Sequence, residues 1–252
     1  GQNFLVDPDY AARIVAALDP ARQDRVVEIG PGHGALTRLL LDRLAALDAI
    51  ELDRDLAPAL TGLPGAEGLT IHTADALAFD FTTLAAERGG PLRLVGNLPY
   101  NIATPLIFHL LDQIAAVTDM VFMLQREVVD RIVASPGTRT YGRLSVMVQA
   151  VCATTPLFRV PPGAFYPAPK VTSGLVHLRP HGDSSAARPL PPQFAIVVER
   201  AFRQRRKTLR NALKGLCSAD CLAAAGIDPG ARAESLAVAD FRRIAEQTGT
   251  ES

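Results

Sequence analysis

Strand-like and helix-like stretches alternate through the first 125 residues of the chain. Short apolar runs occur at 25–29, 49–52, 69–73, 92–95 and 120–124, the first of them β-branched. Stretches between them, such as 35–47, carry leucines at helical spacing. Parallel strands need long crossover connections, which are usually helices. The alternation therefore predicts an α/β fold with a doubly wound, mostly parallel sheet.

The second half of the chain predicts the rest of the sheet and a separate helical part. Two closing strands are expected at 146–160 and at 174–178, which brings the sheet to seven strands. Pro, Gly and Ser then cluster at 179–192, a composition typical of a linker, and 194–213 follows as an expected helix. We therefore expect a sheet domain at residues 1–180 and a small all-helical domain at residues 181–252.

The composition is that of an ordinary globular protein, with 48% hydrophobic and 21% charged residues. Cys152, Cys217 and Cys221 form no Cys-x-x-Cys pair, and the histidines lack ligand spacing, so we expect neither a disulfide framework nor a metal site. Cys217 and Cys221, one helical turn apart, are expected to be small, partly buried residues. Long apolar runs and a signal-peptide pattern are absent, which disfavours membrane insertion and favours the cytoplasm.

A glycine turn follows the first strand. The stretch EIGPGHGALT, residues 28–37, has the spacing G-x-G-x-G rather than the dinucleotide fingerprint G-x-G-x-x-G. Glu51 ends the second strand, where a carboxylate can accept hydrogen bonds from both ribose hydroxyls of a nucleoside, and Asp75, after the third, could accept from an adenine amino group. Gly30, Glu51 and Asp75 therefore predict a site for an adenosine-like ligand. His33 is expected to be a solvated loop residue.

The fourth strand runs into VGNLPYN, residues 95–101. Pro99 favours an extended conformation at Leu98, which can aim the Asn97 amide and nearby carbonyl groups outward together. An exocyclic amino group on a base is a poor nucleophile, and two acceptors holding its hydrogens would favour the tetrahedral form that attacks. Tyr100 offers a flat face on which a base can stack, an interaction typically worth about 1–3 kcal/mol. This turn therefore predicts a site that receives a base amine.

Six blocks of the sequence together resemble the ribosomal RNA adenine dimethyltransferase family of the KsgA type. They cover nearly the whole chain in the family's order: GQNFL at 1–5, EIGPGHGALT, IELD at 50–53, GNLPYNIATP at 96–105, YGRLSV at 141–146 and VPPGAFYPAPKV at 160–171. The resemblance implies a Rossmann-like methyltransferase sheet in residues 1–180 and an RNA-docking role for residues 181–252.

The resemblance also implies the substrates and the residues that hold them. S-adenosylmethionine would be bound by Asn3, Leu5, Gly30, Glu51, Asp75 and Asn97, and no metal is implied. Asn97 and Tyr100 would act as catalytic groups that receive the target adenine, with Phe165 on its other face. Family members dimethylate two adjacent adenosines near the 3′ end of small-subunit rRNA. The implied partner is therefore an immature small ribosomal particle, and we expect a monomer that acts in ribosome biogenesis.

Seven basic residues and no acidic one lie between 200 and 214, although the net charge of the chain is zero. This basic stripe consists of Arg200, Arg203, Arg205, Arg206, Lys207, Arg210 and Lys214. Such a stripe can bind the phosphates of a nucleic acid, and a solvated helix face is the alternative. Phe165 could likewise be a core residue rather than a stacking group.

Two other functions stay open at this stage. One is a methyltransferase of the same architecture that modifies large-subunit rRNA, although such enzymes usually show Asn-Ile-Pro-Tyr where this chain has Asn-Leu-Pro-Tyr. The other is a nucleic-acid-binding factor that keeps the fold and acts by contact alone. The pocket residues of this chain are intact, which favours catalysis.

Overall fold

The computed structural model describes residues 3–182, 189–204 and 206–248, and the chain divides into two compact units. The first unit comprises Gly1–Val129 and Thr155–Pro180, and the second comprises Asp130–Thr154 and His181–Ser252. The division expected from the sequence, 1–180 and 181–252, differs from this grouping for residues 130–154. That segment packs with the C-terminal helices, as described below.

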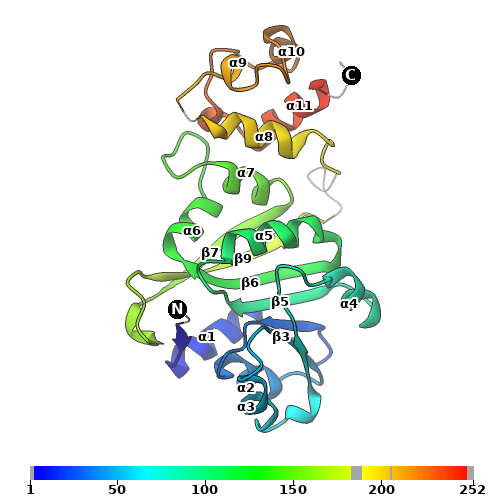
Figure 1. Cartoon of the computed structure of the whole chain (residues 1–252), viewed down its shortest axis with the longest axis vertical. Helices are drawn as coiled ribbons and strands as arrows, with labels where there is room; N and C mark the ends of the chain where they lie inside the picture. Colours follow the sequence, from blue (N-terminus) through cyan, green and yellow to red (C-terminus); the bar gives the residue numbers. More distant parts are fainter. Residues whose placement is uncertain (1–2, 183–188, 205, 249–252) are drawn as a thin grey trace. The chain divides into compact units, whose positions relative to one another are not determined.

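The first unit contains a seven-stranded mixed sheet (Figure 1). Its strands are β2 (Val26–Ile29), β3 (Leu47–Glu51), β4 (Leu69–Thr73), β5 (Leu92–Asn97), β6 (Val117–Gln125), β7 (Cys152–Val160) and β9 (Ser173–Pro180), in the order β4-β3-β2-β5-β6-β9-β7. The first three residues of β7 fall in the second unit. The pairs from β4 through β6 are parallel, and β9 runs antiparallel to β6. The predicted doubly wound seven-stranded sheet is confirmed.

A two-stranded sheet stands beside the large one. Strand β1 (Phe4–Leu5) pairs antiparallel with β8 (Phe165–Tyr166), so that Leu5 lies opposite Phe165. Buried residues of β1, β8 and helix α1 share one hydrophobic cluster with the leucines of α2. This pairing, which the sequence analysis did not predict, fixes the N-terminal segment against the Pro-rich loop.

The helices of the first unit lie between its strands along the chain. They are α1 (Pro8–Leu18), α2 (Ala35–Leu41), α3 (Ala57–Thr61), α4 (Phe81–Glu87) and α5 (Ala103–Asp112), while α6 (Arg126–Ile132) crosses the unit boundary. The predicted helix 35–47 is too long, because α2 ends at Leu41 and Leu47 already begins β3. No helix of the described residues is long and apolar enough to cross a membrane.

Residues 146–149 are helical, so their assignment to a strand was wrong. Helix α7 (Arg143–Gln149) buries Val146 and Val148, and Ser145 accepts a hydrogen bond from the Gly142 N–H at the start of the helix. A short apolar run cannot be assigned to helix or strand from its periodicity alone, and here the packing of α7 on α8 decides.

The second unit is built from helices that share one core. Helix α8 (Phe194–Arg203) packs against α7, α9 (Leu209–Ala212) and α11 (Val238–Thr248), and α10 (Ala219–Ala224) packs against α11; Figure 1 shows α8 to α11 grouped together. The Tyr141 hydroxyl donates to the Leu236 carbonyl at 2.9 Å, which joins the 130–154 segment to this group. The predicted helix 194–213 is interrupted after Arg203, where closely spaced like charges disfavour a continuous helix.

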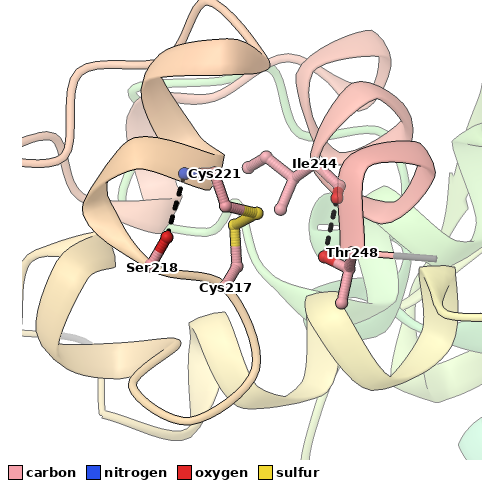
Figure 2. Close-up of a disulfide and its surroundings, with 5 residues drawn as sticks. All are labelled: Cys217, Ser218, Cys221, Ile244 and Thr248. Atoms are coloured by element: carbon pink, nitrogen blue, oxygen red, sulfur yellow. Dashed lines mark hydrogen bonds between the residues drawn. A yellow bond between two sulfur atoms is a disulfide. The ribbon is translucent and has the colours of Figure 1, made fainter. Parts of the chain in front are cut away.

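Cys217 and Cys221 form a disulfide in the second unit (Figure 2). Cys217 and Cys221 were expected to be partly buried small residues in a chain without a disulfide framework. The structure instead joins them in a disulfide and buries both, with 2% and 3% exposure. Ser218 lies between them and caps α10 by accepting the Cys221 N–H at 3.0 Å. This turn brings the two side chains together beside Ile244 and Thr248 of α11.

A partly buried ion network, centred on the buried Asp119, holds β5 and β6 together in the first unit. The Arg93 guanidinium donates to both oxygens of Asp119, at 2.7 and 2.9 Å, and to Asp24 at 2.7 Å. The His177 Nε2 lies 2.9 Å from Asp119. Burial raises the pKa of the Asp119 carboxyl, but hydrogen bonds from Arg93 and His177 outweigh it and bring that pKa down to about 2.

Replacing Arg93 by methionine should destabilise the first unit by about 3 kcal/mol at pH 7, because Asp119 would remain as a buried carboxylate without its main partner. The Asp119 contribution is fully present above its unfolded pKa of about 4 and is lost as the pH falls through about 2. The stability difference between wild type and Arg93→Met, measured by urea unfolding, should therefore shrink between pH 4 and pH 2.

The exposed Arg43 provides the matched control for this substitution. Arg43→Met should change the free energy of unfolding by less than about 0.5 kcal/mol. Equal losses for the two variants would show that the Arg93 network does not stabilise the fold.

Candidate functional site

The candidate site is a cavity of about 300 Å³ in the first unit, at the carboxyl ends of the parallel strands. Its lining comes from the N-terminal segment, the glycine turn after β2, the ends of β3 and β5, and the residues that follow β4 and β5. In an open α/β sheet, ligands bind at this edge. The cavity brings together Asn3, Leu5, Gly30, Glu51, Asp75, Asn97 and Tyr100, all predicted site residues.

The glycine turn and the end of β3 are joined by the Glu51 carboxylate. Its Oε2 accepts the Gly32 N–H at 3.2 Å and its Oε1 accepts the Asp53 N–H at 2.9 Å. Gly32 has a φ of +56°, and a Cβ atom there would lie 2.9 Å from the Phe4 ring. Only glycine therefore allows this turn to lie against the N-terminal segment.

The tip of β5 is joined to the N-terminal segment through Asn97. Its side-chain Nδ2 donates to the Asn3 carbonyl oxygen at 3.0 Å. A carbonyl oxygen can only accept, so the amide NH₂ must face Asn3 and the Asn97 Oδ1 is left as an acceptor. The geometry therefore fits the predicted role of Asn97 as an acceptor for an amine.

Tyr100, Asp75 and Phe165, the other side chains predicted to contact an adenine ring, differ in their exposure to solvent. The Tyr100 hydroxyl lies 2.8 Å from the Ser173 Oγ, which fixes a half-buried ring at the cavity. Asp75 is exposed, and its Oδ1 accepts the Leu77 N–H at 2.9 Å. Phe165, in contrast, is 4% exposed, belongs to the hydrophobic cluster of the first unit and is not part of the cavity lining.

Several lining residues were not predicted from the sequence. Glu28 is buried at 1% exposure, and the Thr37 hydroxyl donates to its Oε2 at 2.6 Å. Burial raises the pKa of the Glu28 carboxyl to about 7, with a smaller raising effect from the charge of Glu51, while the Thr37 bond lowers it. A carboxyl two residues before the first glycine of the turn was the available signal for Glu28. His33, which was expected to be merely solvated, is exposed and also lines the cavity.

Two other kinds of catalytic group, a metal-binding cluster and a reactive thiol, are not found among the described residues. Among the described residues, no group of three or more His, Cys, Asp and Glu side chains could hold a metal ion. Cys152 is a buried free thiol, and burial raises its pKa to about 12, so the thiolate is not accessible near neutral pH. The site can therefore bind and orient a ligand and accept hydrogen bonds, and the described residues offer it no reactive thiolate.

In the second unit, the basic stripe is exposed. The structure describes six of its members, Arg200, Arg203, Arg206, Lys207, Arg210 and Lys214, and all six are exposed; Arg205 lies outside the described residues. No carboxylate of the described residues forms an ion pair with any of the six. The stripe therefore retains its positive charge for an anionic partner.

Solved structures of RNA-modifying enzymes resemble the chain along nearly its whole length. A dimethyladenosine transferase from Plasmodium falciparum superposes with a TM-score of 0.80 and 25% identity, over 96% of this chain and 95% of that one. The 23S rRNA methyltransferase ErmE gives a TM-score of 0.71 and 25% identity, over 98% of this chain and 100% of that one.

Sequence comparison is more specific. Proteins named ribosomal RNA small subunit methyltransferase A are 55% identical over 248 residues in Acidithiobacillus ferrooxidans and in Methylococcus capsulatus. The match covers 98% of this chain and 92% and 95% of those proteins, respectively. The model of the family described as ribosomal RNA adenine dimethylase matches residues 1–249. With the motifs, the seven-stranded sheet and the strand-tip cavity in place, this chain belongs to the ribosomal RNA adenine dimethylase family of methyltransferases.

Proposed function

We propose that the protein transfers methyl groups from S-adenosylmethionine to the N6 amino groups of two adjacent adenosines near the 3′ end of small-subunit rRNA. The observation that carries this proposal is one cavity that joins a nucleoside-type carboxylate, Glu51, to an amine acceptor, Asn97, and an aromatic face, Tyr100. The products would be N6,N6-dimethyladenosines, and the activity would serve small-subunit biogenesis.

The lining residues fit S-adenosylmethionine. The Glu51 carboxylate lies at the end of β3, and its oxygens keep lone pairs for the two ribose hydroxyls in addition to the backbone bonds that orient them. Asp75 offers an acceptor one strand further along, where an adenine amino group would lie. Leu5 and Gly30 complete the predicted cofactor wall. When bound, the cofactor supplies an electrophilic methyl group on a sulfonium.

The chain's own residues would align the target amine for direct displacement. The Asn97 Oδ1 can accept a hydrogen bond from the N6 amino group and favour its tetrahedral form, while Tyr100 stacks on the adenine. The amine nitrogen loses a proton to solvent once it carries the new methyl group, so no strong general base is required. The target base must leave its stack to enter the cavity, and aromatic stacking offsets part of that cost.

The second unit is proposed to dock the RNA through the basic stripe. Six exposed cations, without ion-pair partners in the part of the chain that the structure describes, would contribute salt-dependent affinity for the phosphate backbone. We further propose that the protein acts as a cytoplasmic monomer on an immature small ribosomal particle.

Methyl transfer onto small-subunit particles that lack the modification tests the function directly. Radiolabel from S-adenosylmethionine should appear on two adjacent adenosines near the 3′ end of the small-subunit rRNA. Labelling of the large subunit would instead favour the activity named for the structural neighbour ErmE. Tight RNA binding without transfer would favour a factor that acts by contact alone.

Asn97→Ala should lower the rate of methyl transfer by about 10²–10³-fold, the usual effect of removing one hydrogen-bonding group that acts in the transition state. Single-turnover transfer to small-subunit particles measures this change. Gln23→Ala removes an exposed amide in the turn between α1 and β2 and should leave the rate unchanged. Normal transfer by Asn97→Ala would remove this residue from the mechanism.

Glu51→Gln should weaken cofactor binding by about ten-fold or more, because a carboxylate that accepts charge-assisted hydrogen bonds becomes a neutral amide. Calorimetric titration with S-adenosylmethionine measures the dissociation constant. The exposed Glu67 gives the matched control, and Glu67→Gln should bind as wild type does. If both variants bind normally, the proposed ribose contact does not exist.

Phe165→Leu separates a stacking role from a core role. Leucine keeps most of the buried volume, so unfolding should become easier by no more than about 1.5 kcal/mol. If the ring moves onto the target adenine, single-turnover transfer should fall well below that of Phe158→Leu, a substitution of a half-buried ring in the same hydrophobic cluster. Equal transfer rates for these two variants would leave Phe165 as a core residue only.

A further inference from the structure

Glu28 has no part in the mechanism described above, yet it borders the cofactor cavity. The residue is 1% exposed, and the Thr37 hydroxyl donates to its Oε2 at 2.6 Å. Glu51, on the neighbouring strand, is 4% exposed and lines the same cavity. None of the described lining residues is Lys or Arg, so these two buried carboxyl groups face a cavity without a fixed positive charge.

The protonation state of Glu28 is balanced near neutral pH. Burial raises the pKa of its carboxyl to about 7, the Thr37 hydrogen bond acts in the lowering direction and the Glu51 charge raises it further. A cation placed in the cavity would favour the ionised form, because an opposite charge nearby stabilises a carboxylate, and more strongly where water is excluded.

We propose that Glu28 is a specificity-determining residue that distinguishes the charged cofactor from its uncharged-sulfur product. This inference rests on the proposed use of S-adenosylmethionine, whose sulfonium S-adenosylhomocysteine lacks. On cofactor binding the Glu28 carboxyl gives its proton to solvent and becomes the counter-charge of the sulfonium. After methyl transfer the sulfur is a neutral thioether, and the carboxylate takes a proton back.

The protein should therefore bind S-adenosylhomocysteine more weakly than S-adenosylmethionine. The carboxylate–sulfonium attraction is present before transfer and absent after it. An enzyme that adds four methyl groups in all, two on each adenosine, must release the product after every transfer. A counter-charge that disappears with the reaction favours this exchange.

Other titratable groups also line the cavity. They are Glu51 at the end of β3, Asp75 after β4, Tyr100 after β5 and His33 in the glycine turn. Asp75 and His33 are exposed, so solvent screens their response to a bound cation more than that of Glu28. His33 lines the same cavity and carries an imidazole ring, which makes it the appropriate control.

Calorimetric titration of the full chain with both ligands, in buffers of different ionisation heat from pH 6 to pH 8, measures the protons released on binding. S-adenosylmethionine should release a fraction of a proton near pH 7, and S-adenosylhomocysteine much less. If binding lowers the Glu28 pKa by one unit from about 7, the dissociation constant of the cofactor should fall about five-fold between pH 6 and pH 8.

Three variants make the assignment to Glu28 specific. Glu28→Gln keeps the shape and an acceptor for the Thr37 hydroxyl; it should abolish the proton release and lower the ratio of cofactor affinity to product affinity. His33→Asn should leave the proton release and the ratio of cofactor affinity to product affinity as in the wild type. Thr37→Val removes the bond that lowers the Glu28 pKa, so the pH midpoint of the proton release should move upward.

Each result bears on a different claim. Equal proton release with the two ligands, or a release that survives in Glu28→Gln and disappears in His33→Asn, would overturn the inference and leave the proposed function intact. Failure of the wild type to bind either ligand would overturn both. A normal thermal unfolding curve for Glu28→Gln shows that its loss of proton release is not caused by misfolding.

Discussion

The candidate site depends on a buried carboxylate that joins two strand ends. Glu51 is 4% exposed, and a charge at that depth must be hydrogen-bonded to be tolerated. The N–H groups of Gly32 and Asp53 supply those bonds, so the glycine turn after β2 and the end of β3 hold one another in place. The Phe4 ring lies where a side chain on Gly32 would have to go, which adds the N-terminal segment to the same arrangement.

The orientation of the Asn97 side chain also depends on the position of the N-terminal segment. Strand β1 is fixed to the Pro-rich loop by its pairing with β8, and the Asn3 carbonyl next to it accepts from Asn97. This bond uses the donor half of the amide and leaves its acceptor half for a ligand. Gly96, one residue earlier, lies so close to the backbone of Ile29 that a side chain would collide with it, which keeps the ends of β2 and β5 together. The residues of the proposed cofactor wall and of the proposed amine acceptor therefore lie along one edge of the sheet.

The sequence predicted those features that depend on local pattern and on strand order. Strand β4 matches its predicted range, and the predicted cofactor residues meet because the carboxyl ends of parallel strands share an edge. The predictions that were wrong or missing concern features that depend on tertiary contacts. Residues 146–149 read equally well as strand or helix until α8 is present, and the burial of Phe165 depends on a β1–β8 pairing between residues about 160 positions apart in the chain. Glu28 carried a visible signal, but its altered pKa arises only from burial in the folded chain.

Although the net charge of the chain is zero, acidic and basic residues are concentrated at different sites in the two units. The cavity in the first unit is lined by three carboxyl groups and by no Lys or Arg of the described residues, which suits a sulfonium cation. The second unit carries six exposed basic residues without ion-pair partners among the described residues, which suits a polyanion. A phosphate backbone that approached the cavity itself would meet carboxylates, so only an uncharged base is favoured there. This distribution of charge is consistent with the proposed entry of an unstacked base, and not of the phosphate backbone, into the cavity.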